Sequence, residues 1–246
     1  EQIRHSITKM SYLHFCSTEL YCKRIIQMGE DPSRVFNSGA PGIDNIVNLD
    51  LLSKDKLEEN LDWKFSSKSA LFTYHPVTLG KNDIPRDLKV ILNVLIKTNI
   101  NVLFTYANAD NGGRFINQKI EEFCRLDPIK YKVVKSLGQL KYLSAMKHTD
   151  LLIGNTSSGI IEAASFGKPV VNIGDRQKGR LKGNNVIDCN LDTLESSINL
   201  AISGDFKEIS QNTHNIYGVG IASDIILNEL VEQEVFVTKK FIDSIP

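Results

Sequence analysis

The stretch that decides the fold is "DLLIGNTSSGIIEAASFGKPVVNIG", residues 150–174. An apolar run ends at Gly154 and leads into a cluster of hydroxyl and glycine residues. A short amphipathic segment follows, and a second apolar run begins after Gly167 and Pro169. The pattern predicts a strand, a helix from near Ser158 to Gly167, and a second strand. Such a segment is typical of a β-α-β unit.

The same alternation extends to both sides of this segment. Short runs rich in β-branched and aromatic residues alternate with helical patterns of ten to fifteen residues, which indicates a mostly parallel sheet covered on both faces. The expected strands are 13–17, 70–74, 101–106, 131–134, 150–154, 169–174 and 184–188, and the expected helices are 18–29, 85–97, 113–125, 139–148, 158–167 and 191–203. The charged stretch 47–68 is expected to be helical and to join two domains. The sequence therefore predicts an α/β fold with a Rossmann-like parallel sheet.

Composition and charge limit the classes of function. The chain has 246 residues, of which 41% are hydrophobic and 24% charged, so it can bury a core. Lysine plus arginine balances aspartate plus glutamate at 29 each, so we expect neither a nucleic-acid nor a membrane partner, and any anion site must be local. The four cysteines are scattered, which argues against a disulfide framework or a zinc site. With neither a membrane-span pattern nor a signal-peptide pattern, a soluble cytoplasmic protein is expected.

Polar residues follow several of the expected strands. Ligands of open α/β sheets bind outside the carboxyl ends of the strands, so these positions are the candidates for a site. They are His75, Asn108, Asp110, 136–138, 155–159 and 174–176.

The hydroxyl cluster after Gly154 suits a phosphate. Thr156, Ser157 and Ser158 offer donors without bulk at a helix start, where backbone N–H groups are unpaired and the dipole is positive. Glu162 follows Ser158 by four residues and shares its helix face, and a carboxylate there suits the two hydroxyls of a ribose. The alternative is ordinary helix capping with a dipole-stabilising glutamate.

The loop "GDRQKGRLKG", residues 174–183, carries four cations, Arg176, Lys178, Arg180 and Lys182, against the single carboxylate of Asp175. This positive patch suits a diphosphate, and the alternative is a solvated surface loop.

His75 ends an expected strand, and the following Pro76 fixes an extended path there. A histidine at this position can donate to a phosphate oxygen or serve as an acid, because its pKa is near neutrality. The alternative is a structural histidine. Asn108 and Asp110 follow the next strand, and their alternative interpretation is turn formation.

Together these motifs resemble the hydrolysing UDP-N-acetylglucosamine 2-epimerases of the sialic-acid pathway. The resemblance covers residues 1 to about 230 and is carried by "IRHSITKMSYLHFCSTE" (3–19), "NSGAPGID" (37–44), "HPVT" (75–78), "NADNGG" (108–113) and "IGNTSSGIIEAASFGKPVVNIGDRQKGR" (153–180). It implies two Rossmann-like domains of the GT-B-like type, with the active site between them and UDP on the second.

Residue by residue, the resemblance implies that Thr156 and Ser157 hold the phosphates, Glu162 the ribose and Arg176 the diphosphate, while the loop at Ser136, Leu137 and Gly138 approaches the uracil. The implied catalytic residues are His75, Arg4 and Asp110. The full implied UDP-binding set is Asn108, Ser136, Leu137, Asn155, Thr156, Ser157, Ser158, Gly159, Glu162 and Arg176. The implied reaction needs no cofactor or metal: a base removes the C2 proton while UDP leaves C1, and water adds to the 2-acetamidoglucal to give N-acetylmannosamine.

The resemblance also implies a further domain ahead of residue 1, which holds the acid and base carboxylates. We expect residues 1–46 to end that domain, 47–225 to form the UDP-binding domain, and 226–246 to pack back across the cleft. The chain alone is expected to bind UDP weakly with little turnover, and the full-length protein to be a homodimer or homotetramer. Feedback by an activated sialic acid stays open, because Gln118 and Glu121 stand in the helix that carries arginines in mammalian relatives.

Four alternatives remain open. A non-hydrolysing 2-epimerase would carry His-Arg-Arg-Glu where this chain has His75, Pro76, Val77 and Thr78. A hydrolysing epimerase for a bacterial diacetamido sugar nucleotide would use the same motifs. A glycosyltransferase would share the Glu162, Gly167 and Pro169 pattern, and the last alternative is a nucleotide-binding module without catalysis.

Overall fold

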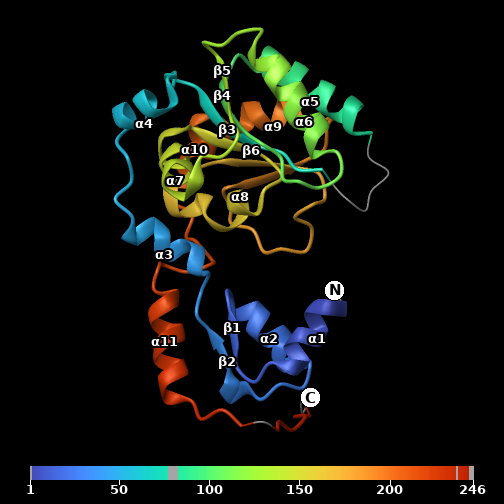
Figure 1. Ribbon diagram of the computed structural model, residues 1–246, viewed down its shortest axis with the longest axis vertical. Coiled ribbons are helices and arrows are strands. Elements are labelled where there is room, and N and C mark those ends of the chain that lie inside the picture. The colour runs from blue at the N-terminus through green and yellow to red at the C-terminus, as the bar shows by residue number, and fades with distance from the viewer. Residues whose placement is uncertain (1, 77–82, 237, 244–246) are drawn as a thin grey trace. The chain divides into compact units, whose positions relative to one another are not determined.

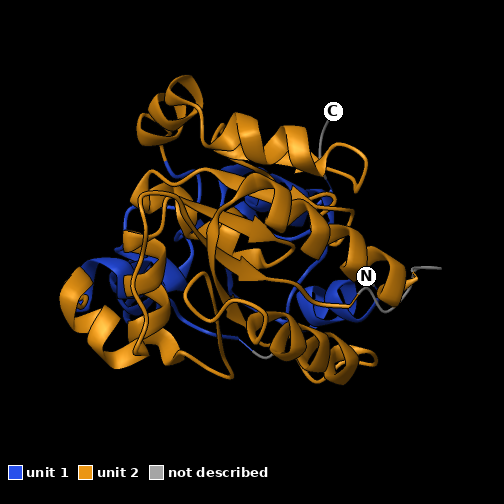
Figure 2. Cartoon of the chain, turned by 90° about the horizontal axis from the view of Figure 1, so that it is seen from above, with its two compact units in different colours: residues 1–49, 215–246 blue, residues 50–214 orange. Residues whose placement is uncertain are grey.

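The computed structural model describes residues 2–76, 83–236 and 238–243. Val77 and Thr78, on which the argument against a non-hydrolysing epimerase depends, lie outside these residues. The chain forms two compact units, Glu1–Leu49 with Asn215–Pro246, and Asp50–His214 (Figure 2). The expected domain boundary at residue 225 would fall inside helix α11 (Ala222–Glu232), which lies wholly in the first unit.

In the described residues, the Asp50–His214 unit contains a six-stranded sheet of order β5-β4-β3-β6-β7-β8, and every neighbouring pair is parallel (Figure 1). Numbered within the unit, this is the order 3-2-1-4-5-6 of doubly wound nucleotide-binding sheets. The strands are β3 (Ser69–Thr73), β4 (Asn101–Thr105), β5 (Tyr131–Val134), β6 (Leu151–Gly154), β7 (Val170–Ile173) and β8 (Val186–Cys189). The expected Rossmann-like α/β fold is confirmed.

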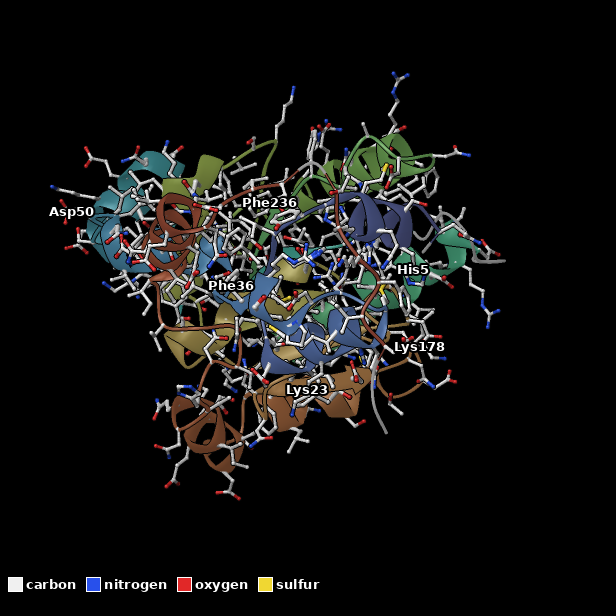
Figure 3. The ribbon with its side chains drawn as sticks, turned by 90° about the horizontal axis from the view of Figure 1, so that it is seen from below. His5, Lys23, Phe36, Asp50, Lys178 and Phe236 are labelled. Atoms are coloured by element: carbon white, nitrogen blue, oxygen red, sulfur yellow. The ribbon has the colours of Figure 1, made fainter. Side chains whose placement is uncertain are left out.

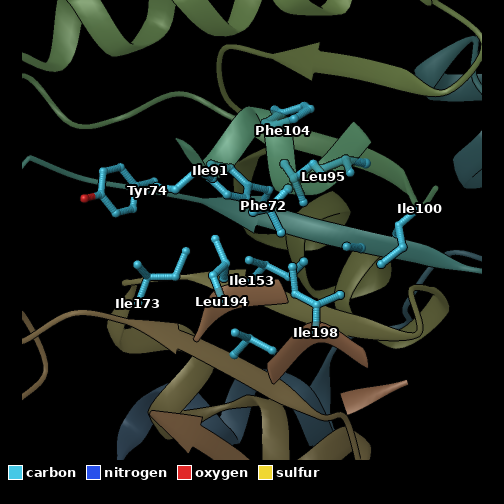
Figure 4. Packing of buried hydrophobic residues seen from close by; sticks show 14 of the residues in the cluster. Phe72, Tyr74, Ile91, Leu95, Ile100, Phe104, Ile153, Ile173, Leu194 and Ile198 are labelled. Atoms are coloured by element: carbon cyan, nitrogen blue, oxygen red, sulfur yellow. The ribbon is translucent and has the colours of Figure 1, made fainter. Parts of the chain in front are cut away.

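Both faces of this sheet are buried because side chains alternate across it. On β3, Ala70 and Phe72 enter one core while Leu71 enters the other, and β6 repeats the pattern with Ile153 on the first side and Leu152 on the second. Figure 4 shows Phe72, Phe104 and Ile153 in the first core. The apolar runs of the sequence are therefore strands buried on both sides.

The helices divide between these two cores. Helices α5, α6 and α9 supply the first core, and α4, α7 and the α8–η2 segment the second. The bounds are α4 (Lys54–Leu61), α5 (Ile84–Thr98), α6 (Gly113–Cys124), α7 (Gly138–His148), α8 (Ser157–Ile161), the 3-10 helix η2 (Ala163–Phe166), α9 (Leu194–Ala201) and α10 (Gly204–Gln211). Within the stretch 47–68, the helical residues are the end of α3 and α4.

The expected continuous helix 158–167 is wrong. Its α-helical part, α8, ends at Ile161, and η2 follows after Glu162. The Glu162 N–H still reaches back four residues to the Ser158 carbonyl (2.8 Å), whereas the Ser165 N–H reaches back only three, to Glu162 (3.0 Å). The turn therefore tightens at Glu162 before Gly167 ends it in the left-handed conformation.

The other unit is built around the short parallel pair of β1 (His14–Cys16) and β2 (Val35–Asn37). Its helices are α1 (Gln2–Met10), α2 (Glu19–Gln27), the 3-10 helix η1 (Pro32–Arg34), α3 (Pro41–Asn48) and α11. Asp44 of α3 accepts the N–H groups of Ala222 (3.0 Å) and Ser223 (2.6 Å), so the start of α11 is capped from a distant part of the sequence.

A buried carboxylate joins the described part of the C-terminal segment to this unit. Glu30, 2% exposed, contacts Lys9, His14 and Lys239 at 2.6, 3.1 and 2.6 Å. The Ile242 N–H donates to the Gly29 carbonyl (3.1 Å).

Among the described residues, no helix combines the length and apolar character needed to cross a bilayer.

Candidate functional site

The candidate site lies where the strand order reverses, between β3 and β6. The chain leaves these neighbouring strands towards opposite faces of the sheet, and such a switch point opens a crevice at the carboxyl ends of the strands. His75 follows β3 and Asn155 follows β6, so the topology places them side by side.

Asn155 connects the two strand ends. Its N–H donates to the Thr73 carbonyl (3.1 Å), its Oδ1 accepts the His75 N–H (2.8 Å), and its Nδ2 donates to the His75 carbonyl (2.8 Å). The side chain is fully buried. Both ends of the Asn155 amide therefore hold the His75 peptide, and the expected contact of Asn155 with UDP stays a prediction.

Gly154 makes this close approach possible. A Cβ at residue 154 would lie 1.9 Å from the Thr73 carbonyl oxygen, and its φ of 140° is in the region that favours glycine. The glycine before the hydroxyl cluster is thus required by packing at the switch point.

The loop after β7 reaches the same residue. Arg176 Nη1 and Gln177 Nε2 both donate to the Asn155 carbonyl, at 3.0 and 2.8 Å. Gln177 is 2% exposed, and its Oε1 has no hydrogen-bond partner among the described residues. The sequence does not single out Gln177, because a glutamine within a basic loop carries no distinguishing pattern.

The other cations of this loop behave differently from Arg176. Lys182 is bound by the Asp188 carboxylate at 2.7 Å to each oxygen, which neutralises its charge. Lys178 and Arg180 are exposed, and Figure 3 shows Lys178 among the surface side chains. Arg176 therefore contacts the switch point, and binding of a diphosphate by the four cations of this loop stays a prediction.

His75 is half-buried and its ring is held from the β4 end. The Asn108 N–H donates to Nδ1 (3.1 Å), and the Asn108 side chain donates to Asp110 Oδ2 (2.5 Å). Burial lowers the pKa of His75, nearby Arg176 lowers it further, and Asp110 opposes both. The structure therefore brings together four predicted residues, His75, Asn108, Asp110 and Arg176.

The hydroxyl cluster begins directly after Asn155, at the start of α8. Thr156 caps α8 by accepting the Ser158 N–H (3.3 Å), and the Ser158 hydroxyl donates to the Glu162 carboxylate. Burial raises the pKa of Glu162, and the bond from Ser158 partly offsets this. Ser157, the first residue of α8, is half-buried. Gly159 packs on β7, since a Cβ there would lie 3.1 Å from Val170 Cγ1.

Tyr142 of α7 is a second residue that sequence reasoning missed. Its phenol interacts with Ser158, Thr73 and Thr156, and burial raises its pKa. A tyrosine on an amphipathic helix looks like a core residue in the sequence, so only the packing of α7 against the cluster reveals the contact.

The remaining predicted residues lie at the edges of this arrangement. Ser136 is exposed and its Oγ accepts the Gly138 N–H (3.3 Å). The Leu137 side chain is buried in the second core, so a uracil base could contact only the backbone of this residue. Arg4 lies on α1, in the other unit, and its catalytic role stays a prediction.

Within residues 2–76, 83–236 and 238–243, no group of three or more His, Cys, Asp or Glu side chains could hold a metal ion. The four cysteines are buried free thiols. The predicted residues near the switch point include the hydroxyls of Thr156 and Ser157 and the guanidinium of Arg176, and such donors suit an anion.

Comparison with known proteins gives a consistent result. The family model described as UDP-N-acetylglucosamine 2-epimerase matches residues 1–231. A Campylobacter jejuni protein named GDP/UDP-N,N'-diacetylbacillosamine 2-epimerase (hydrolyzing) is 43% identical over 85% of this chain and 54% of its own length. The Escherichia coli polysialic acid biosynthesis protein P7 is 38% identical over 88% of this chain and 56% of its own. The chain thus spans about half the length of these relatives.

Among solved structures, the UDP-GlcNAc 2-epimerase from Neisseria meningitidis, bound to UDP-GlcNAc, superposes with a TM-score of 0.77. It is 20% identical, and the match covers 92% of this chain and 63% of that one. At this identity the likeness establishes the fold, and it agrees with the GT-B-like type expected from the sequence.

Proposed function

Because the chain belongs to the UDP-N-acetylglucosamine 2-epimerase family, we propose that it is the UDP-binding part of a hydrolysing 2-epimerase that acts on a UDP-linked 2-acetamido sugar. The observation that carries the proposal is the meeting of His75 and Arg176 on Asn155 at the switch point. A cation and a ring N–H donor beside one crevice suit a diphosphate.

In this proposal the nucleotide lies along the carboxyl ends of β3, β6 and β7. Arg176 and the hydroxyls of Thr156 and Ser157 take the diphosphate, and the Glu162 carboxylate accepts from the ribose hydroxyls. The backbone near Leu137 faces the uracil. The Ser158 hydroxyl donates to one Glu162 oxygen, which orients the carboxylate towards the ribose in this proposal.

The proposed reaction is an elimination followed by a hydration. A base takes the C2 proton, the C1–O bond breaks with its electron pair leaving on UDP, and a C1–C2 double bond forms. Water then adds its hydroxyl to C1 and a proton to C2, with C2 inverted. Donors at the diphosphate lower the barrier, because charge develops on the leaving oxygen. The base is assigned to the carboxylates expected in the further domain.

Two sugars are candidates. UDP-N-acetylglucosamine, giving N-acetylmannosamine and free UDP, follows from the motifs of the sequence. The identity of 43% to an enzyme named for a diacetylbacillosamine nucleotide favours UDP-N,N'-diacetylbacillosamine. We therefore place the diacetamido sugar first and UDP-N-acetylglucosamine second for the full-length protein, which we expect to be a cytoplasmic homo-oligomer.

Product analysis tests the reaction. The full-length protein is incubated with each UDP-sugar in heavy water and the products are followed by NMR. We expect free UDP and a free sugar with inverted C2 that carries deuterium. A UDP-linked product would favour the non-hydrolysing reaction, and turnover that requires a sugar acceptor would favour a glycosyltransferase.

Calorimetry tests the nucleotide site. We expect UDP binding by the 246-residue chain to be weakened in Ser157→Ala and Arg176→Ala, because each removes a donor to the diphosphate. Equal affinity in both variants and the unchanged chain would refute the assigned site.

A further inference from the structure

The ring of His75 is held at one nitrogen only. The Asn108 N–H donates to Nδ1 (3.1 Å), and Nε2 forms no hydrogen bond or ion pair with any residue that the structure describes. A ring nitrogen that accepts an N–H carries no proton. In a neutral imidazole the single proton then resides on the other nitrogen, which here is Nε2.

The donor at Nδ1 is a fixed one. It belongs to the main chain, at the start of the turn between β4 and α6. The Gly113 N–H donates to the Asp110 carbonyl (2.8 Å), and the Asn108 carbonyl lies so close to Gly113 that a Cβ there would approach it to 2.1 Å. The turn therefore keeps the Asn108 N–H directed at the ring.

The peptide that carries the ring is also fixed. Asn155 binds both its N–H and its carbonyl at 2.8 Å, and the Asn155 carbonyl is in turn held by Arg176 and Gln177. The backbone of His75 is therefore held in place at the switch point. Nε2 is the ring nitrogen that can still bind a ligand.

Burial and the neighbouring guanidinium favour the neutral form of the ring. Arg176, from the β7 loop, and Asp110, from the β4 loop, are the charged groups that act on it. Burial, and after it Arg176, lower the pKa of His75 and outweigh the opposite effect of Asp110, which favours the neutral ring.

We propose that Asn108 and Asn155 are positioning residues that hold His75 as the tautomer protonated on Nε2, and that His75 works as a fixed hydrogen-bond donor to an anionic oxygen. A base would have to accept a proton at Nε2, which already carries one, or at Nδ1, which Asn108 occupies. The proton at C2 is thus removed by another group. The identity of the anion, a phosphate oxygen of UDP, rests on the proposed function.

The tautomer is measured directly by ¹⁵N NMR of the 246-residue chain labelled at histidine. The His75 signals are identified by their loss in His75→Gln. We expect Nδ1 to show the shift of an unprotonated nitrogen and Nε2 that of a protonated one. A predominant Nδ1–H form, or an equal mixture, would overturn the inference.

A matched pair of variants tests the positioning by Asn108. Asn108→Ala keeps the main-chain N–H and should leave the His75 tautomer unchanged. Asn108→Pro removes that N–H and should give a mixture of the two tautomers. An unchanged single tautomer in a folded Asn108→Pro variant would overturn the role given to Asn108. If this variant does not fold, the spectra of the unchanged chain and of Asn108→Ala decide the tautomer.

A second pair tests the donor role. Glutamine can place an amide N–H near the position of Nε2, whereas asparagine reaches only the position of Nδ1. We expect His75→Gln to bind UDP within about threefold of the unchanged chain and His75→Asn to lose about ten- to hundredfold, the range for one hydrogen bond to a charged group. Equal losses in the two variants would contradict a donor at Nε2.

The two proposals can fail separately. Absence of UDP binding by the unchanged chain would overturn the proposed function, whereas the tautomer measurement needs no nucleotide and would still decide the state of His75.

Discussion

Replacing single cations of the loop 174–183 separates a specific contact from a diffuse positive field. Arg176 is half-buried, donates to the Asn155 carbonyl at 3.0 Å and acts on His75, whereas Lys178 is exposed and carries the same charge two residues away. Lys182 is already neutralised by Asp188. If UDP needs a fixed donor at the switch point, the three cations contribute very unequally to its binding.

The size of the difference follows from the environments. Losing a hydrogen bond between a partly buried guanidinium and phosphate costs about 1.5 to 3 kcal/mol, or about 10- to 100-fold in the dissociation constant of UDP. Removing an exposed lysine costs about 0 to 1 kcal/mol, and less as salt screens it. We expect Arg176→Ala to reach the first range, and Lys178→Ala and Lys182→Ala to stay within the second.

The assay is calorimetric titration of the 246-residue chain with UDP at two salt concentrations, about 0.05 and 0.3 M, which bracket the range where exposed charges become screened. Thermal melting of each variant controls for folding. Equal losses in Arg176→Ala and Lys178→Ala, with both disappearing at high salt, would refute the specific contact and support a diffuse basic loop.

Three further outcomes follow from other parts of the molecule. Glu162→Gln should weaken UDP binding yet raise the melting temperature at pH 7. Burial raises the pKa of Glu162, so ionisation of the carboxylate destabilises the fold as pH rises through that pKa, and glutamine does not ionise. A lower melting temperature for Glu162→Gln would contradict this explanation. Gly154→Ala should lower the free energy of unfolding by about 2 kcal/mol or more, measured by urea titration, since its Cβ would meet the Thr73 carbonyl. Burial alone would raise the pKa of Glu30, but hydrogen bonds from Lys239, Lys9 and His14 hold that pKa at about 2. About 3 kcal/mol of folding stability should therefore be lost as pH falls from 4.5 towards 2. Glu30→Gln should remove this pH dependence of stability.

The sequence predicts the sheet well, because strands buried on both faces are continuous apolar runs ended by glycine and polar residues. Helices α5, α6 and α7 follow from the same periodic signal. The α8–η2 segment is not predicted, since nothing in the periodicity distinguishes an α-helical turn from a 3-10 turn at Glu162. Helix α10 is missed because it is short, polar and joined closely to α9.

The sequence predicts where the candidate site lies, but not which contacts each of its residues makes. Residues at strand ends can be identified from sequence, which is why His75, Asp110 and Arg176 are found together. Which of these residues contact a ligand depends on hydrogen bonds made across the sheet. Asn155 matches a binding motif, yet its amide is used on the His75 peptide, and Gln177 stands in no motif but is buried at the centre.

The arrangement around Glu162 shows how function and stability oppose each other at this site. The carboxylate is buried against Ser158 and Tyr142, which costs desolvation free energy, and the hydroxyl of Ser158 offsets only part of that cost. An apolar or amide side chain would suit the fold better at this position. The carboxylate is explained if bound nucleotide supplies the missing donors, because two ribose hydroxyls would satisfy its remaining lone pairs and return the free energy lost on burial. The stability measured for Glu162→Gln and the affinity for UDP should therefore change in opposite directions, which a purely structural glutamate would not produce.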